Sequence, residues 1–237
     1  MKDKNGIIWL LAAALCTVVL WHVPYGNFIL YPFTILVTWF HEMGHGLCAL
    51  ILGGTFERLV IYADGSGTAF YHGPVAFGRL GQVLVSSAGP LGPSMAGALV
   101  IFASRKESSA RLALFLLGTA LLLSTALWVR SLFGFVLVPL MGLAILAIAV
   151  WASTWVRNFA VQFLGVQACI SVYHQVNYLF TKSVIINGEL TLSDTGSIAE
   201  QLWLPYWIWG ALIAALSLLL LLWSLLRVYA ENDAEIT

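Results

Sequence analysis

The chain alternates between long apolar runs and short polar segments. A helix needs about 20 mainly apolar residues to cross the hydrocarbon core of a bilayer, and most of the runs reach that length. A retained first span is expected rather than a removed leader, because no convincing small-x-small cleavage site precedes His22. The pattern therefore predicts an all-α polytopic membrane protein with about seven transmembrane helices, near residues 7–20, 28–52, 75–103, 112–128, 134–155, 159–180 and 202–228.

The segment 55–74, between the second and third runs, has a different pattern. Residues 56–62 and 68–72 are rich in β-branched and aromatic side chains, and they flank the turn sequence Asp64-Gly-Ser-Gly67. This arrangement predicts a short β-hairpin whose edge could bind an extended peptide by strand addition. An ordinary interfacial loop is the alternative interpretation.

Composition supports a lipid bilayer as the environment. Hydrophobic residues make up 60% of the chain and charged residues 9%, with a mean hydropathy of +0.91. A soluble domain could not cover its surface with so few charges. The formal net charge is zero, so nothing indicates a nucleic-acid partner. Residues 1–237 are interpreted as one integral-membrane domain with a polar tail at 229–237, and near-equal Lys and Arg counts on the two sides leave its orientation open.

The main chemical motif, His41-Glu42-Met43-Gly44-His45, lies inside the apolar run 28–52. A helix presents residues four apart on one face, so His41 and His45 can bind one Zn²⁺. Glu42 can take a proton from zinc-bound water and later deliver it to a leaving amine. Ionisable side chains within a membrane span are costly, which favours a functional site facing the protein interior. An inert or repurposed motif is the alternative.

A catalytic zinc usually has three protein ligands and one open position. Two of the four aspartates lie in the polar termini, and Asp64 is explained by its turn. Asp194 lies in the late segment 187–201 between two apolar runs, where a membrane-dipping stretch could bring it to the histidines. Ser193 or Asp194 could equally cap a short helix. The rival third ligands are Glu200 and His174, the latter also interpretable as a hydrogen-bonded structural histidine.

Small residues and prolines alternate over 86–94, Ser-Ser-Ala-Gly-Pro-Leu-Gly-Pro-Ser. Small side chains let helices approach closely, and prolines free backbone groups that need other partners. We expect a kinked, tightly packed helix beside the site, with Gln82, Ser86 and Ser87 as candidates to line a path for water.

Three features together resemble the site-2 protease family of intramembrane zinc metalloproteases, in its compact Peptidase M50B-like branch. They are residues 41–45 followed by Gly53-Gly54, the Asp64 turn leading to Ser87-Ala-Gly-Pro90, and Ser193-Asp-Thr195 ahead of Trp203 and Trp207. The resemblance implies that His41, His45 and Asp194 are zinc ligands and that Glu42 is the base. Better-known members carry their aspartate in a Leu-Asp-Gly motif after an Asn-x-x-Pro-x-Pro run, and this chain has neither.

The resemblance implies a zinc-dependent endopeptidase that cleaves a membrane protein or peptide substrate in or near the bilayer, with Glu42 activating the zinc-bound water. A multi-pass protein of a bacterial cytoplasmic membrane is expected. The competing class is a non-enzymatic membrane scaffold or carrier with a repurposed zinc motif. That class predicts that His41, Glu42 and His45 tolerate substitution.

Overall fold

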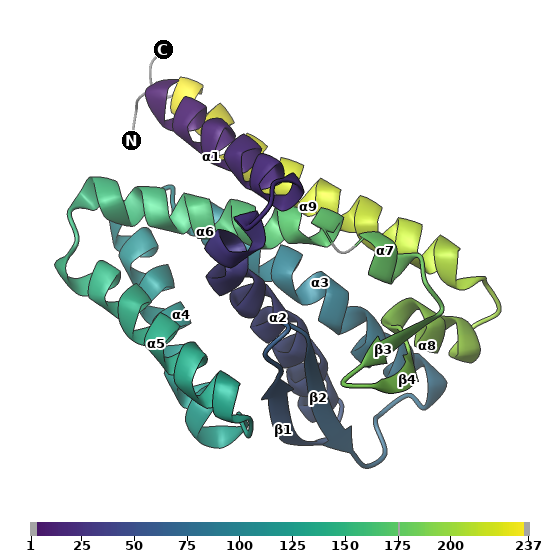
Figure 1. Ribbon diagram of the computed structural model, residues 1–237. Helices are drawn as coiled ribbons and strands as arrows, with labels where there is room; N and C mark the ends of the chain where they lie inside the picture. The colour runs from purple at the N-terminus through teal and green to yellow at the C-terminus, as the bar shows by residue number, and fades with distance from the viewer. Residues whose placement is uncertain (1–3, 175, 235–237) are drawn as a thin grey trace.

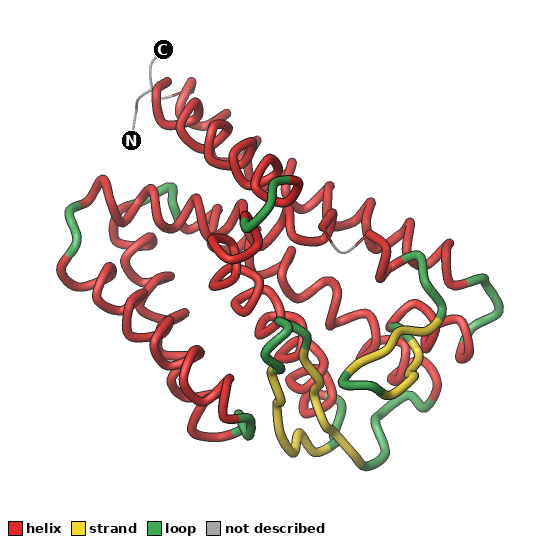
Figure 2. The backbone as a smooth tube through the Cα atoms, in the orientation of Figure 1, coloured by secondary structure: helices red, strands yellow, loops and turns green. Residues whose placement is uncertain are grey.

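The computed structural model describes residues 4–174 and 176–234, which are mostly helical (Figure 1). Two small antiparallel hairpins lie near each other at one side of the helices, as Figure 2 shows in yellow. The elements in chain order are α1 Lys4–His22, α2 Gly26–Ile51, β1 Thr55–Ile61, β2 Gly67–His72, α3 Arg79–Ala103, α4 Glu107–Leu127, α5 Leu132–Trp151, α6 Thr154–His174, α7 Val176–Leu179, β3 Ser183–Ile186, β4 Glu189–Leu192, α8 Asp194–Gln201 and α9 Tyr206–Ala234.

Helix α2, which carries the histidine motif, packs closely against α3. A Cβ at Gly44 would lie 2.2 Å from the carbonyl oxygen of Ala88, and one at Gly92 would lie 2.6 Å from that of Phe40. The two backbones can therefore approach only because these positions lack a side chain. The expected close packing of the small-residue segment is confirmed, with Pro90 and Pro93 inside the assigned helix α3.

The main apolar core lies on another side of α2, where it meets β1, α4 and α5. Ile35 and Met43 of α2 pack there with Leu59 of β1 and Leu114 of α4. A buried hydrogen bond from Trp39 Nε1 to Ser124 Oγ (2.8 Å) fixes α2 against α4. The motif helix is thus held by packing on several sides.

The predicted hairpin at 55–74 is present, with Leu59 opposite Ala69. Its turn is fixed to α2 by hydrogen bonds from Tyr31 Oη to the Ala63 carbonyl (2.9 Å) and from Thr38 Oγ1 to the Gly65 carbonyl (2.6 Å). The outer edge of β1 is already paired through a parallel bridge between Leu59 and Val129. The outer edge of β2 has no strand partner among the described residues.

A second hairpin, β3–β4, occupies residues that the sequence analysis did not assign to strands. Its two-residue turn, Asn187-Gly188, has both φ angles positive, at 50° and 83°. Asn-Gly favours this turn because Gly, and to a lesser degree Asn, adopt positive φ easily. Helix α8 follows at once, and Ser193 Oγ caps it by accepting from the Gly196 N–H at 3.0 Å.

The expected seven spans are not confirmed. By length and composition, the described residues contain four helices able to cross a membrane, or up to five if α1 and α2, bent by 114°, count as one broken span. Helix α6 falls outside this set because Arg157, Asn158, Gln162 and Gln167 lower its hydropathy. Several apolar helices nevertheless indicate a multi-pass membrane protein. The four are α3, α4, α5 and residues 206–228 of α9.

Candidate metal centre

Three buried side chains from distant parts of the chain meet beside α2. His41 Nε2 lies 3.0 Å from Asp194 Oδ2, and His45 Nε2 lies 3.1 Å from Asp194 Oδ1. One ligand atom from each residue can be chosen so that all lie within 4.8 Å of one another. Donors about 2.0–2.2 Å from a tetrahedral zinc lie about 3.3–3.6 Å apart, so a small adjustment of this N, N, O donor set fits the ion. The cluster could hold a metal ion.

The orientation of His45 is set by helix α3. Its Nδ1 lies 2.8 Å from the carbonyl oxygen of Val85, and because a carbonyl can only accept, Nδ1 carries the proton. Nε2 is then the nitrogen that faces Asp194 and is available to a metal ion. The backbone of Gly89 is in close contact with the same ring, since a Cβ there would be 2.1 Å from His45 Nε2. Helix α3 thus fixes both the tautomer and the position of this imidazole.

Asp194 is oriented by Tyr178, a residue of α7 that the sequence analysis did not single out. The Tyr178 hydroxyl donates to Asp194 Oδ2 at 3.0 Å and accepts from the Asp194 backbone N–H at 3.3 Å. Its ring also stands edge-on to His41, with centroids 5.9 Å apart. Ser193 supplies the helix cap, so the Asp194 carboxylate is available to the histidines. No motif in the sequence marks Tyr178.

Glu42 lies beside the cluster but is held by the first hairpin. Its side chain is buried, and Oε2 accepts a hydrogen bond from the Ala69 N–H of β2 at 2.7 Å. The bond aligns the carboxylate with the outer edge of that strand. A Cβ at Gly67 would meet Glu42 Cγ at 2.9 Å, so the strand approaches α2 closely here.

A cavity of about 520 Å³ opens onto all four of these side chains. Strand β2 lines one part of it, while β4 and the turn before it line another. Of the residues expected to line a water path, Ser86 borders this cavity, whereas Gln82 and Ser87 do not border it. Its lining comprises His41, Glu42, His45, Tyr62, residues 67–71, Ser86, Tyr178, Ile186, Asn187, Glu189, Thr191, Leu192, Asp194 and Ser197.

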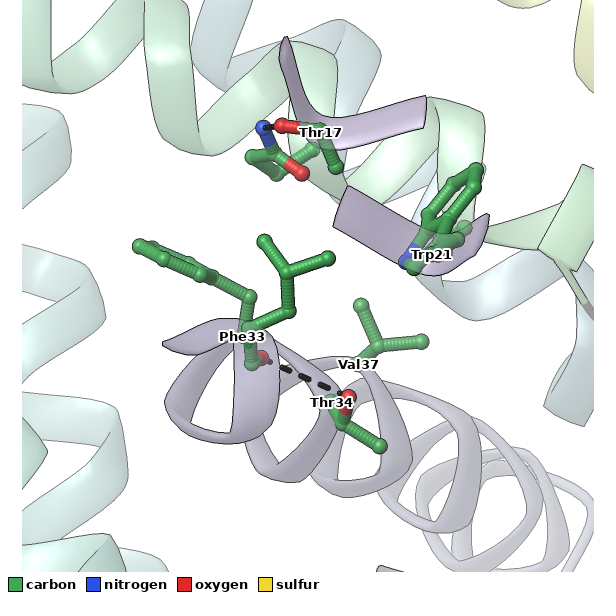
Figure 3. A pocket seen from close by; sticks show the side chains of 8 residues that line it. Thr17, Trp21, Phe33, Thr34 and Val37 are labelled. Atoms are coloured by element: carbon green, nitrogen blue, oxygen red, sulfur yellow. Dashed lines mark hydrogen bonds between the residues drawn. The ribbon is translucent and has the colours of Figure 1, made fainter. Parts of the chain in front are cut away.

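Two threonines of α2 also border further cavities. Thr34 and Thr38 precede His41 on the helix and border a cavity of about 380 Å³ that reaches His41 and Glu42. Thr34 borders in addition a cavity of about 30 Å³ between α1, α2 and α6, where Thr17 and Trp21 face Phe33, Thr34 and Val37 (Figure 3). Gln167 donates to Thr17 there at 2.5 Å.

The other candidate ligands considered from the sequence are not part of this cluster in the described structure. Glu200 lies near the other end of α8, where its carboxylate is half exposed and 4.0 Å from Lys182 Nζ. Asp64 accepts hydrogen bonds from the Ser66 hydroxyl (2.7 Å) and backbone N–H (2.9 Å), and these bonds hold its pKa below its ordinary value. The turn therefore accounts for Asp64, as expected. His174 ends α6, and its side chain lies outside the described residues.

Comparison with protein families gives one match of nearly full length. A family model described as Peptidase M50B-like matches residues 10–224, a range that includes the cluster, Glu42 and both hairpins. The comparisons with curated proteins and with solved structures find no match. The match covers nearly the whole chain, and the chain therefore belongs to the Peptidase M50B-like family.

Proposed function

We propose that this protein is a zinc-dependent intramembrane endopeptidase, which hydrolyses a peptide bond in or near the membrane part of its substrate. The observation that carries the proposal is the buried group of His41, His45 and Asp194 beside Glu42, at a cavity bordered by an open strand edge. Membership of a peptidase family and the apolar helices support it independently.

His41 and His45 would hold Zn²⁺ through Nε2, and Asp194 through its carboxylate. Two imidazoles and one carboxylate form a donor set used by catalytic zinc, which keeps a fourth position open. When bound, Zn²⁺ supplies a Lewis acid for the scissile carbonyl and lowers the pKa of a water molecule. Val85 and Tyr178 keep two of the three ligands in position through their hydrogen bonds.

Glu42 acts as the general base and then as the acid. Ala69 holds Oε2, which leaves the other carboxylate oxygen to receive a proton from the attacking water. The water oxygen bonds to the carbonyl carbon, the C–N bond breaks, and the proton passes to the leaving amine. The water reaches this buried position past the hydroxyls of Thr34 and Thr38.

The substrate binds as an extended segment along β2. A helical amide is already hydrogen-bonded within its helix, so the segment must unwind before the carbonyl can be attacked. The outer edge of β1 is paired with Val129, whereas that of β2 borders the cavity. Along this edge the backbone N–H and C=O of Ala69 point away from β1, as the hydrogen bond from its N–H to Glu42 indicates. The carbonyl of Ala69 and the backbone of Tyr71 are positioned to pair with the added strand.

The test is cleavage of a mixture of random dodecapeptides with blocked ends, read by mass spectrometry on detergent-purified, zinc-loaded protein. Glu42→Gln should lower the cleavage rate by about 10²–10⁴-fold while the zinc content stays unchanged. Glu57→Gln is the matched control, because Glu57 is an exposed carboxylate of the same hairpin that contacts Arg58. Equal cleavage by Glu42→Gln and the wild type would contradict the proposal.

A further inference from the structure

The second hairpin has two chemically different faces. Ile185 and Leu190 are paired with each other and are 73% and 75% exposed. Neither borders the cavity of about 520 Å³, although Ile185 borders the neighbouring cavity of about 380 Å³. Ile186, Glu189 and Thr191 do border the larger cavity. Because side chains alternate along a strand, Glu189 and Thr191 share one face of β4 and point towards the site, whereas Leu190 lies on the other face.

Strand β4 also has an open edge. In a two-residue hairpin the pair next to the turn, here Ile186 and Glu189, is hydrogen-bonded, and such pairs then alternate along the ladder. The bond from Ser193 N–H to the Lys182 carbonyl (3.0 Å) fits this alternation. Leu190 and Leu192 therefore turn their backbone groups to the outer edge, which pairs with no strand in residues 4–174 and 176–234.

The same cavity thus borders on two strands with open outer edges, β2 and β4, which belong to separate sheets. Its volume of about 520 Å³ lies within the range of about 300–1,000 Å³ that is usual for ligand sites. An extended peptide is the ligand whose backbone can use strand edges of this kind. The second hairpin would contact such a peptide on a further side, and the chain continues from its strand β4 to Asp194.

The cavity of about 520 Å³ is lined by acidic side chains without basic Lys or Arg partners. Its described lining contains Glu42, Glu189 and Asp194 but no Lys or Arg. The two charges of a bound Zn²⁺ would be balanced by Asp194 and Glu42, and Glu42 also accepts from Ala69. Glu189 is exposed, and its carboxylate has no hydrogen-bond or ion-pair partner within the described chain. It gives the occupied cavity a net negative charge.

We propose that the substrate strand lies between β2 and β4, and that Glu189 selects a Lys or Arg side chain in it. This inference rests on the proposed peptidase function and names its substrate class. Four extended steps, of about 3.3 Å each, lead from Glu189 to Ser193, which directly precedes Asp194. The selected side chain therefore lies roughly four residues from the cleaved bond. Basic residues commonly flank membrane spans, so a juxtamembrane segment fits the site.

The experiment compares position-specific cleavage of the random dodecapeptide mixture by the wild type, Glu189→Lys and the charge-reversed control Glu57→Lys. The wild type should prefer Lys or Arg over Asp or Glu, on the order of fivefold, at one position about four residues from the cut, and added salt should weaken the preference. Glu189→Lys should reverse it, and Glu57→Lys should keep it. Unchanged preference in Glu189→Lys with normal total cleavage would overturn the inference.

A binding measurement separates failure of this inference from failure of the proposed function. Two labelled dodecapeptides that differ only by Lys or Glu at the selected position are bound to zinc-loaded Glu42→Gln protein, with and without Glu189→Lys. Tighter binding of the Lys peptide, reversed by Glu189→Lys, supports the inference even if the wild type cleaves nothing. Equal binding of the two peptides overturns it, whatever the cleavage result. Glu189 is exposed, so Glu189→Lys removes no packed side chain.

Discussion

The contact between Gly89 and His45 makes a quantitative prediction about zinc binding. A Cβ added by Gly89→Ala would lie 2.1 Å from His45 Nε2, 2.3 Å from Cε1 and 2.7 Å from Cδ2. Ordinary carbon contacts lie at about 3.5–4.0 Å, so the ring must retreat by more than about 1 Å. The ring cannot relieve this clash simply by rotating, because its Nδ1 is hydrogen-bonded to the carbonyl of Val85, on the same helix as Gly89.

A shift of that size would remove one of the three proposed zinc ligands. Metal–ligand distances tolerate deviations of only about 0.2 Å. Changes to residues that merely support a ligand already weaken metal affinity by about 10–100-fold. Displacing the ligand itself should weaken zinc affinity by at least about 100-fold, which corresponds to about 2.7 kcal/mol. Peptide cleavage should fall with zinc occupancy.

The assay is competition for zinc between the purified protein and a chelator of known affinity. Gly97→Ala is the matched control on the same helix, because its Cβ would lie 2.6 Å from the Gly165 carbonyl oxygen, away from the histidines. Overpacking there should cost about 1–3 kcal/mol of stability and lower the Tm, but leave zinc affinity within about threefold. Wild-type zinc affinity in Gly89→Ala would refute the reasoning.

Two further substitutions test the groups that support the site. Tyr178→Phe removes the hydroxyl that donates to Asp194 and should weaken zinc affinity by about 10–100-fold in a folded protein; unchanged affinity in the chelator assay would show that the hydroxyl is dispensable. Thr38→Val removes the bond to the Gly65 carbonyl, worth about 1 kcal/mol, and should raise KM for peptides without changing zinc content. Unaltered amide exchange over residues 62–68 in Thr38→Val would argue against a role in holding the hairpin.

The parts of the site that follow from local periodicity could be predicted from the sequence. His41 and His45 share a helix face because they are four residues apart, and the glycine-rich turn at Asp64 defines the first hairpin. The glycines of 86–94 likewise predicted a close helix contact. Each of these features depends on neighbouring residues alone, which is why a single sequence reveals them.

Other parts depend on tertiary contacts that have no local pattern. The carbonyl of Val85 and the hydroxyl of Tyr178 orient the ligands, yet neither lies in a recognisable motif. Only the family resemblance singles out Asp194 as a ligand, because its position in the chain also suits a helix cap. The structure gives the capping role to Ser193 and leaves the Asp194 carboxylate facing the histidines.

The second hairpin and the number of spans show two different limits of prediction from a single sequence. Asn187-Gly188 is a strong turn signal that could have revealed β3–β4, but the strands beside it are only four residues each. Counting apolar runs does not distinguish a membrane span from a buried helix that carries polar residues, such as α6 with Gln162 and Gln167. Burial inside the protein and burial in lipid give similar sequence patterns.

Zinc per chain in folded, detergent-purified protein is the measurement that tests the proposed metal site most directly. Wild type, Asp194→Ala and Glu200→Ala are supplied with zinc, desalted and analysed for metal, with folding checked for each. We expect about one zinc in the wild type and in Glu200→Ala, whose carboxylate lies near Lys182, and a clear loss in Asp194→Ala. Full zinc in well-folded Asp194→Ala, or none in the wild type, would contradict the three-ligand site.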